Sequence, residues 1–111
     1  VEQTQTRDGG KQVTLNKIEF ADTETRVFLT VKNTSNKNVF ISLNNPEAVQ
    51  KDSIVAQLYN LDNNYQMELK PGQQVNGLII LGPVNPLLHS ADFRFGNQVL
   101  GEQPWVFRVE W

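Results

Sequence analysis

The residues with the strongest catalytic character are His89, Ser90 and Asp92, which are the residue types of a hydrolytic triad. A triad requires its three side chains to converge. In an extended segment alternate side chains point to opposite faces, so Ser90 and Asp92 share one face and His89 takes the other. We therefore expect a surface loop that enters a strand here, and no enzymatic activity.

Metal and cofactor sites are weakly supported. His89 is the only histidine and the chain has no cysteine, so a multi-histidine site and a thiolate site are excluded within one chain. Asp62, Asn63 and Asn64 offer oxygen ligands, but the glycine and the distal glutamate of a helix-loop-helix calcium site are missing. Such a polar run is more typical of a turn. We expect no metal and no other cofactor.

The charge of the chain excludes two classes of partner. Its formal net charge is -2, and lysine and arginine occur only at isolated positions. Neutralising the phosphates of a nucleic acid requires clustered basic residues. We therefore expect no nucleic-acid partner, and contact with a membrane only through an anchor that has been removed.

Aromatic side chains are the best candidates for a binding surface. Phe28 and Phe40 fall on the opposite parity from the apolar residues of their segments, and Trp111 ends the chain. Tyr59 and Tyr65 flank an asparagine-rich turn, where aromatic rings beside amides can stack on a sugar or a peptide. The alternative is that each aromatic residue belongs to the core or to incidental surface. The candidate partner or ligand surface consists of Phe28, Phe40, Tyr59, Asn63, Tyr65 and Trp111.

Apolar residues recur at a spacing of two, which indicates strands. In residues 12–21 the apolar parity changes near Asn16 and Lys17, which predicts a bulge or a switch between sheets. The next two strands present apolar triplets to one core, Val27, Leu29 and Val31 in the first and Val39, Ile41 and Leu43 in the second. Residues 33–37 between them either close a hairpin or cross from one sheet to the other. Glu24 and Arg26 share a parity around the turn before the first of these strands, where they either form an ion pair that orders the loop or belong to a solvated loop.

Shorter elements follow. Residues 47–52 form either a helical turn or a short edge strand, and 53–59 and 64–69 are predicted strands. A tight turn at 69–72 precedes residues 75–81, whose nearly continuous apolar run predicts a central strand covered on both faces. The last strands are 91–95 and 105–111. Seven to nine short strands in 111 residues predict an all-β, immunoglobulin-like antiparallel β-sandwich.

The first eleven residues look different from the rest. They are polar and lack periodicity, so we interpret residues 1–11 as an N-terminal tether and 12–111 as the sandwich domain. Removing residues 1–9 is then expected to leave the melting temperature nearly unchanged.

The segment 17–35, with Thr-Glu-Thr-Arg at 23–26, resembles a family of bacterial immunoglobulin-like domains of unknown function. Ala-Val-Gln at 48–50 and Leu-Lys-Pro-Gly at 69–72 are similar in kind and position. The resemblance implies an extracytoplasmic location, often on a lipoprotein or a membrane-anchored protein, and it carries no catalytic residues to transfer.

Two functional hypotheses remain open. The first is a non-catalytic extracytoplasmic interaction or spacer module that binds a protein or a cell-envelope component, as a monomer or a weak homodimer. The second is a small-ligand or carbohydrate-binding module that uses the aromatic residues and the asparagine-rich loop.

Overall fold

The computed structural model describes residues 2–51, 53–57, 66–96 and 103–111. These residues form ten strands and one short 3-10 helix, and every strand pairing is antiparallel. The strands are β1 (Gln3–Arg7), β2 (Lys11–Phe20), β3 (Thr25–Asn33), β4 (Val39–Ser42), β5 (Glu47–Gln50), β6 (Ser53–Gln57), β7 (Gln66–Leu69), β8 (Gln74–Leu81), β9 (Ser90–Phe95) and β10 (Trp105–Glu110), and the helix is η1 (Pro86–Leu88).

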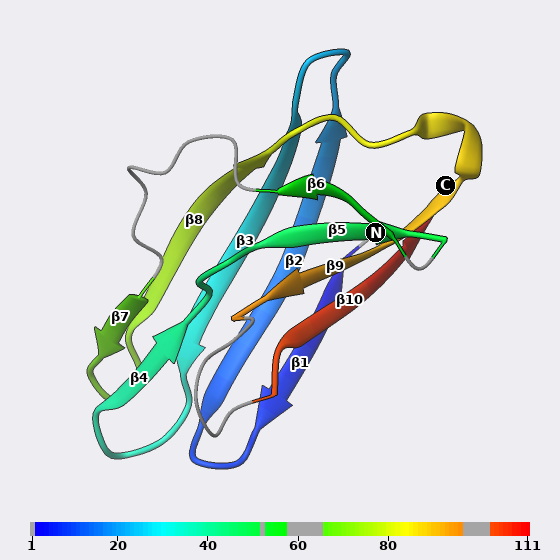
Figure 1. Ribbon diagram of the computed structural model, residues 1–111. Helices are drawn as coiled ribbons and strands as arrows, with labels where there is room; N and C mark the ends of the chain where they lie inside the picture. Colours follow the sequence, from blue (N-terminus) through cyan, green and yellow to red (C-terminus); the bar gives the residue numbers. More distant parts are fainter. Residues whose placement is uncertain (1, 52, 58–65, 97–102) are drawn as a thin grey trace.

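The strands form two larger sheets and one ribbon. One sheet has the order β1-β2-β3-β8, the other has the order β10-β9-β5-β6, and β4 pairs with β7. Figure 1 shows β5, β9 and β10 as one layer that crosses in front of β2 and β3. The predicted all-β, sandwich-like fold is confirmed. The described part of the chain has ten strands instead of seven to nine.

Strand alternation builds the first half of the core as predicted. Val27, Leu29 and Val31 of β3 are buried. The pairing of β2 with β3 shifts register between Leu15 and Lys17, so the predicted irregularity near Asn16 is confirmed as a bulge-type shift. This shift changes which parity of β2 faces inward, as a bulge does.

The chain crosses between sheets after β3, because β3 pairs with β8 while β4 pairs with β7. Asn33, which is fully buried, organises this crossing. Its Nδ2 donates to the carbonyl oxygens of Lys37 at 2.6 Å and Leu69 at 3.0 Å, and its Oδ1 accepts from the backbone N of Ser35 at 2.9 Å. These bonds satisfy the backbone where the regular ladder of β3 ends.

Two later elements differ from the prediction. Residues 47–50 form β5, which lies between β6 and β9 in its sheet and is therefore neither helical nor an edge strand. β8 was expected at the centre of a sheet, but it ends the order β1-β2-β3-β8 and Leu78 is 39% exposed. Its inward set includes Ile79 and Leu81, and Leu78 and Ile80 extend the apolar run on the outward face. The apolar run therefore does not require cover on both faces.

The interpretation of residues 1–11 as a tether is wrong, because Gln3–Arg7 forms β1 and pairs with β2. Three alternate side chains of β1 also donate to carbonyl oxygens along β10: Gln3 to Arg108 at 2.6 Å, Gln5 to Val106, and Arg7 to Pro104 at 2.7 Å. The Arg7 guanidinium lies 3.9 Å from the ring centre of Trp105. β1 lacks apolar periodicity because it joins the two layers through polar side chains.

Aromatic residues fill the second half of the core. β9 and β10 lie where predicted and pair over their full lengths. Phe93, Phe95, Trp105 and Phe107 are almost fully buried, and the rings of Phe95 and Phe107 meet edge to face at 6.1 Å. Because the inner faces of β9 and β10 are closely packed, the backbone that carries their outward side chains is held in place.

Candidate functional site

The described members of the predicted aromatic surface lie apart. Phe28 faces outward from β3, where the Lys17 Nζ lies 5.2 Å from the ring centre. Phe40 is 49% exposed on β4. Trp111 is half-buried against the core, its ring 4.6 Å from that of Phe20 and its Nε1 donating to the Pro86 oxygen. Tyr59, Asn63 and Tyr65 lie outside the described residues.

His89, Ser90 and Asp92 do not form a triad. His89 ends η1 in a left-handed conformation (φ 58°) with an exposed side chain. Ser90 and Asp92 project from the outer face of β9, where both contact Arg108 of β10. Ser90 and Asp92 thus share one face of β9, as expected, and Arg108 makes them part of a polar cleft.

This cleft lies on the outer face of the sheet β10-β9-β5-β6. It encloses about 210 Å³, and its lining comes from β5, the turn after it, β9 and β10. Asp92 stands at its centre, because it pairs with Arg108 on one side and with Val49 on the other. The lining residues are Val49, Gln50, Lys51, Ser90, Asp92, Arg94 and Arg108, which we call the basic cleft.

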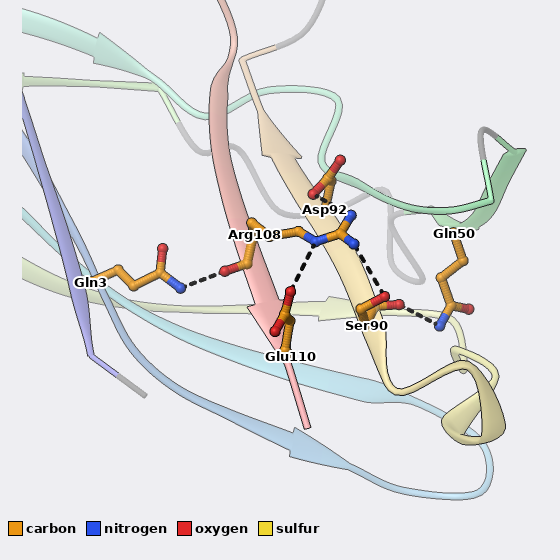
Figure 2. A network of polar contacts seen from close by, with 6 residues as sticks. All are labelled: Gln3, Gln50, Ser90, Asp92, Arg108 and Glu110. Carbon is orange, nitrogen blue, oxygen red and sulfur yellow. Dashed lines mark hydrogen bonds and ion pairs between the residues drawn. The ribbon is translucent and has the colours of Figure 1, made fainter.

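Arg108 is the hub of the polar contacts in the basic cleft (Figure 2). Its Nη1 lies 3.2 Å from Asp92 Oδ1, and its Nη2 donates to Ser90 Oγ at 3.4 Å. Its Nε lies 3.9 Å from Glu110 Oε1, which is beyond hydrogen-bond length. Figure 2 also shows Gln3 of β1 bonded to the Arg108 carbonyl, so the layer beneath helps to hold this strand.

Gln50 forms the inner wall of the basic cleft and is only 3% exposed. Its Nε2 donates to the carbonyl oxygens of Asn85 at 2.9 Å and Ser90 at 3.0 Å, and its Oε1 accepts from the Asn85 backbone N at 3.0 Å. Two of these bonds hold Asn85, before η1, and the third holds Ser90, at the start of β9, to the end of β5. The wall is thus fixed by satisfied polar groups, as buried amides require.

The remaining cations stand around the same opening. Lys51 follows β5 with a φ of 49°, a region uncommon for residues other than glycine. Arg94 extends from β9, and its Nη1 lies 3.6 Å from Glu47 Oε1. Among the lining residues, three cations (Lys51, Arg94 and Arg108) therefore face one acid, Asp92.

A tighter charge cluster lies on the opposite sheet. Arg26 Nε donates to Glu24 Oε2 at 2.9 Å, which confirms the ion pair predicted for the turn, and Lys17 Nζ lies 2.9 Å from Glu19. The hydrogen bond from Lys17 lowers the pKa of Glu19, and the bond to Glu24 raises the pKa of Arg26. Here the charges neutralise one another at short range, in contrast to the basic cleft.

A second cleft lies beside the half-buried Trp111. It encloses about 280 Å³ and is lined by Phe20, Ala21, Asp22, Val84 and Pro86. Phe20 is 41% exposed there, so an aromatic face and a carboxylate border one opening. We call it the aromatic cleft.

The sequence contains part of the signal for the basic cleft. Parity places Asp92 and Arg94 on one face of β9, and Arg108 and Glu110 on one face of β10. The missing information was the register that sets Arg108 opposite Asp92, together with the position of β5 beside β9. Side-chain parity cannot supply either one.

Comparison with known proteins places the fold only. No protein-family model matches the chain, and no curated protein is significantly similar to it. A solved structure, the yjhA protein from Bacillus subtilis, matches with a TM-score of 0.60 and 14% sequence identity, over 97% of this chain and 95% of that one. In the described residues no helix is long and apolar enough to cross a membrane.

Proposed function

We propose that the protein is a non-catalytic, extracytoplasmic immunoglobulin-like interaction module that binds a partner protein at the basic cleft. The order β10-β9-β5-β6 supports the immunoglobulin-like assignment, because it resembles the G-F-C sheet with an added C′ strand. β2, β3 and β8 correspond in the same way to strands A, B and E. The resemblance of residues 17–35 to bacterial domains of this kind supports the extracytoplasmic location.

The observation that carries the binding proposal is the basic cleft itself. A chain with a net charge of -2 gathers three cations around one opening, and it does so on a sheet whose inner face is packed with buried aromatics. Rigid presentation of this kind lowers the entropy that binding must overcome. Positive potential on a small patch also speeds encounter with an acidic partner. The mechanism is recognition by a preformed surface, by a monomer or a weak homodimer.

Site-specific photocrosslinking in intact cells tests this function. A benzophenone side chain at Val106, which is exposed on β10 beside Arg94, is expected to give one discrete crosslinked species. The same group at Asn76, exposed on the other sheet, is the matched control. Equal crosslinking from both positions, or none from Val106, contradicts the proposal.

Cell fractionation tests the location separately. The full-length protein is expected in the envelope or secreted fraction of its own cells. Its recovery with a cytoplasmic marker enzyme contradicts the proposed location while leaving the binding site open to test.

The aromatic cleft favours a second candidate, carbohydrate binding. Phe20 can stack on a sugar ring, and the Asp22 carboxylate can accept hydrogen bonds from its hydroxyl groups. Titration with neutral hexasaccharides such as cellohexaose tests this function through the fluorescence of Trp111, whose ring contacts Phe20. A saturable change that Phe20→Ala abolishes supports it, and an unchanged spectrum contradicts it.

A further inference from the structure

The guanidinium groups of the basic cleft retain hydrogen-bonding capacity. An arginine side chain carries five N–H donors. Within the described residues, Arg108 directs two of its nitrogens at Asp92 and Ser90, at 3.2 and 3.4 Å, and Arg94 approaches Glu47 only at 3.6 Å. The contact with Asp92 is at the long end of the hydrogen-bond range, and the contacts at 3.4 and 3.6 Å lie beyond it. Both arginines can therefore donate to an incoming acceptor without breaking a strong bond.

The neighbouring acids only partly offset this charge. Glu110 is 77% exposed and screened by water, and Glu47, which is 13% exposed, lies against Arg94 outside the lining. Among the described residues that line the opening, Asp92 is the one acid, with three cations around it. The positive charge of the cleft is therefore complementary to an anion that can bind in spite of repulsion by Asp92.

The size and the central acid narrow the class of anion. At about 210 Å³ the cleft is smaller than the 300 to 1,000 Å³ typical of sites for drug-sized ligands, so it suits a single side chain. A carboxylate carries one negative charge and a phosphate about 1.5 to 2. The phosphate is attracted more strongly by the three cations, but it is also repelled more strongly by Asp92 and loses more hydration on entering a small opening. Arginine also binds carboxylates with two parallel hydrogen bonds.

Resting on the proposed function, we propose that the basic cleft recognises a glutamate or aspartate side chain in an acidic segment of the partner protein. Arg94 and Arg108 bind the carboxylate, and Lys51 attracts neighbouring acidic residues of the same segment. Asp92 orients Arg108 and disfavours phosphorylated segments.

Fluorescence anisotropy with a neutral dye tests this recognition. The probes are a hexaglutamate peptide, a hexaglutamine peptide, and a peptide with three phosphoserines that matches the hexaglutamate charge. The intact chain is expected to bind hexaglutamate saturably, the phosphopeptide more weakly, and hexaglutamine not detectably. Tighter binding of the phosphopeptide, or no binding of hexaglutamate, overturns the proposal.

Three variants that each remove one positive charge show where the peptide binds. Arg94→Gln and Arg108→Gln are each expected to weaken hexaglutamate binding about tenfold, equivalent to about 1.4 kcal/mol. Arg26→Gln, on the opposite sheet, is the matched control and should change the dissociation constant less than twofold. An equal loss in Arg26→Gln would mean that only net charge matters, and would overturn the assignment.

A variant that binds more tightly separates loss of a contact from unfolding, because an unfolded variant cannot gain affinity. Asp92→Asn removes the central negative charge, so phosphopeptide binding should strengthen more than hexaglutamate binding does. An unchanged ratio of the two affinities contradicts the role given to Asp92. If Val106 still crosslinks to a partner while hexaglutamate fails to bind, the carboxylate inference is wrong and the proposed function stands. Absence of that crosslink counts against the function itself.

Discussion

Buried residues help to determine the shape of this protein's surface. Gln50 belongs to the wall of the basic cleft, yet its three hydrogen bonds all reach backbone atoms of Asn85 and Ser90. A buried amide that is fully bonded stabilises its neighbours, and its removal leaves those partners unsatisfied. The shape of the cleft thus depends on a residue that need not touch a ligand.

Gln50→Ala is expected to lower the free energy of unfolding by about 2 to 3 kcal/mol, because three hydrogen bonds are lost and their partly buried backbone partners are left unpaired. Urea denaturation followed by circular dichroism measures the change. Gln74→Ala, at an exposed position on β8, is the control and should change stability little. If Gln50→Ala lowers the free energy of unfolding by less than about 0.5 kcal/mol, the stabilising role given to the Gln50 hydrogen bonds is wrong.

The charge cluster around Glu19 predicts a pH dependence. The hydrogen bond from Lys17 lowers the pKa of Glu19 from its usual 4.5, so the folded state favours the charged carboxylate. The resulting stabilisation is present above 4.5 and is lost as the pH falls through the lowered value. Melting temperatures of the native chain and Glu19→Gln should therefore differ more at pH 7 than at pH 3. Because Glu19 is partly exposed, we expect the difference in melting temperature to be small. A larger difference at pH 3 than at pH 7 would contradict the prediction.

At the residue scale, local sequence predicted only local contacts. The ion pair of Glu24 and Arg26 was predictable because two residues on one parity of a short turn meet regardless of topology. Arg94 and Arg108 line one cleft with Asp92 and Lys51 only after three separate segments, β9, β10 and the turn after β5, come together. No parity argument relates residues on strands whose order is unknown.

At the scale of elements, β1 shows the limit of reading apolar periodicity. A strand is recognised by an alternating apolar face, but the inward face of β1 consists of Gln3, Gln5 and Arg7. These side chains donate to carbonyl oxygens of β10, the end strand of the facing sheet, and of Pro104 just before it. Polar groups thus replace an apolar seam, and the segment resembles a solvated tail in sequence.

The triple variant Gln3→Ala, Gln5→Ala, Arg7→Ala is expected to lose about 2 to 4 kcal/mol of stability, from three hydrogen bonds and one cation–π contact. Thr4→Ala with Thr6→Ala changes the outward face of the same strand and is the matched control. Urea denaturation compares the two. If the triple variant unfolds at the same midpoint as the control, β1 is the dispensable tail that its composition suggested.

The strand β3 carries a prediction that sequence and structure share. Leu29 is buried in the core on β3, the strand that pairs with both β2 and β8, so Leu29→Ala should cost about 2 to 5 kcal/mol by creating a cavity. Thermal and urea melts measure the loss. Thr30→Ala, on the outward face of β3, should cost clearly less. An unchanged midpoint for Leu29→Ala would remove the evidence that β3 is central to the core.

At the scale of the whole molecule, sequence predicted the fold class and most strands but not their assembly. Alternation located β2, β3, β9 and β10, because each has one apolar and one polar face. It misplaced β8, since an apolar outward face does not show whether another layer covers it. The crossing after β3 stayed open in sequence because Asn33 directs it through bonds to Lys37 and the distant Leu69.

The central claim is that a partner binds at the face formed by β5, β9 and β10. Nuclear magnetic resonance of the ¹⁵N-labelled chain, titrated with hexaglutamate, tests it most directly, because backbone amides and arginine Nε–H groups report on each strand separately. We expect saturable shifts at Lys51, Asp92, Arg94 and Arg108, with the signals of Arg26 and of the outward residues of β2 and β3 unchanged. Shifts that centre on Arg26 or the aromatic cleft, or that are absent at saturating peptide, would contradict it.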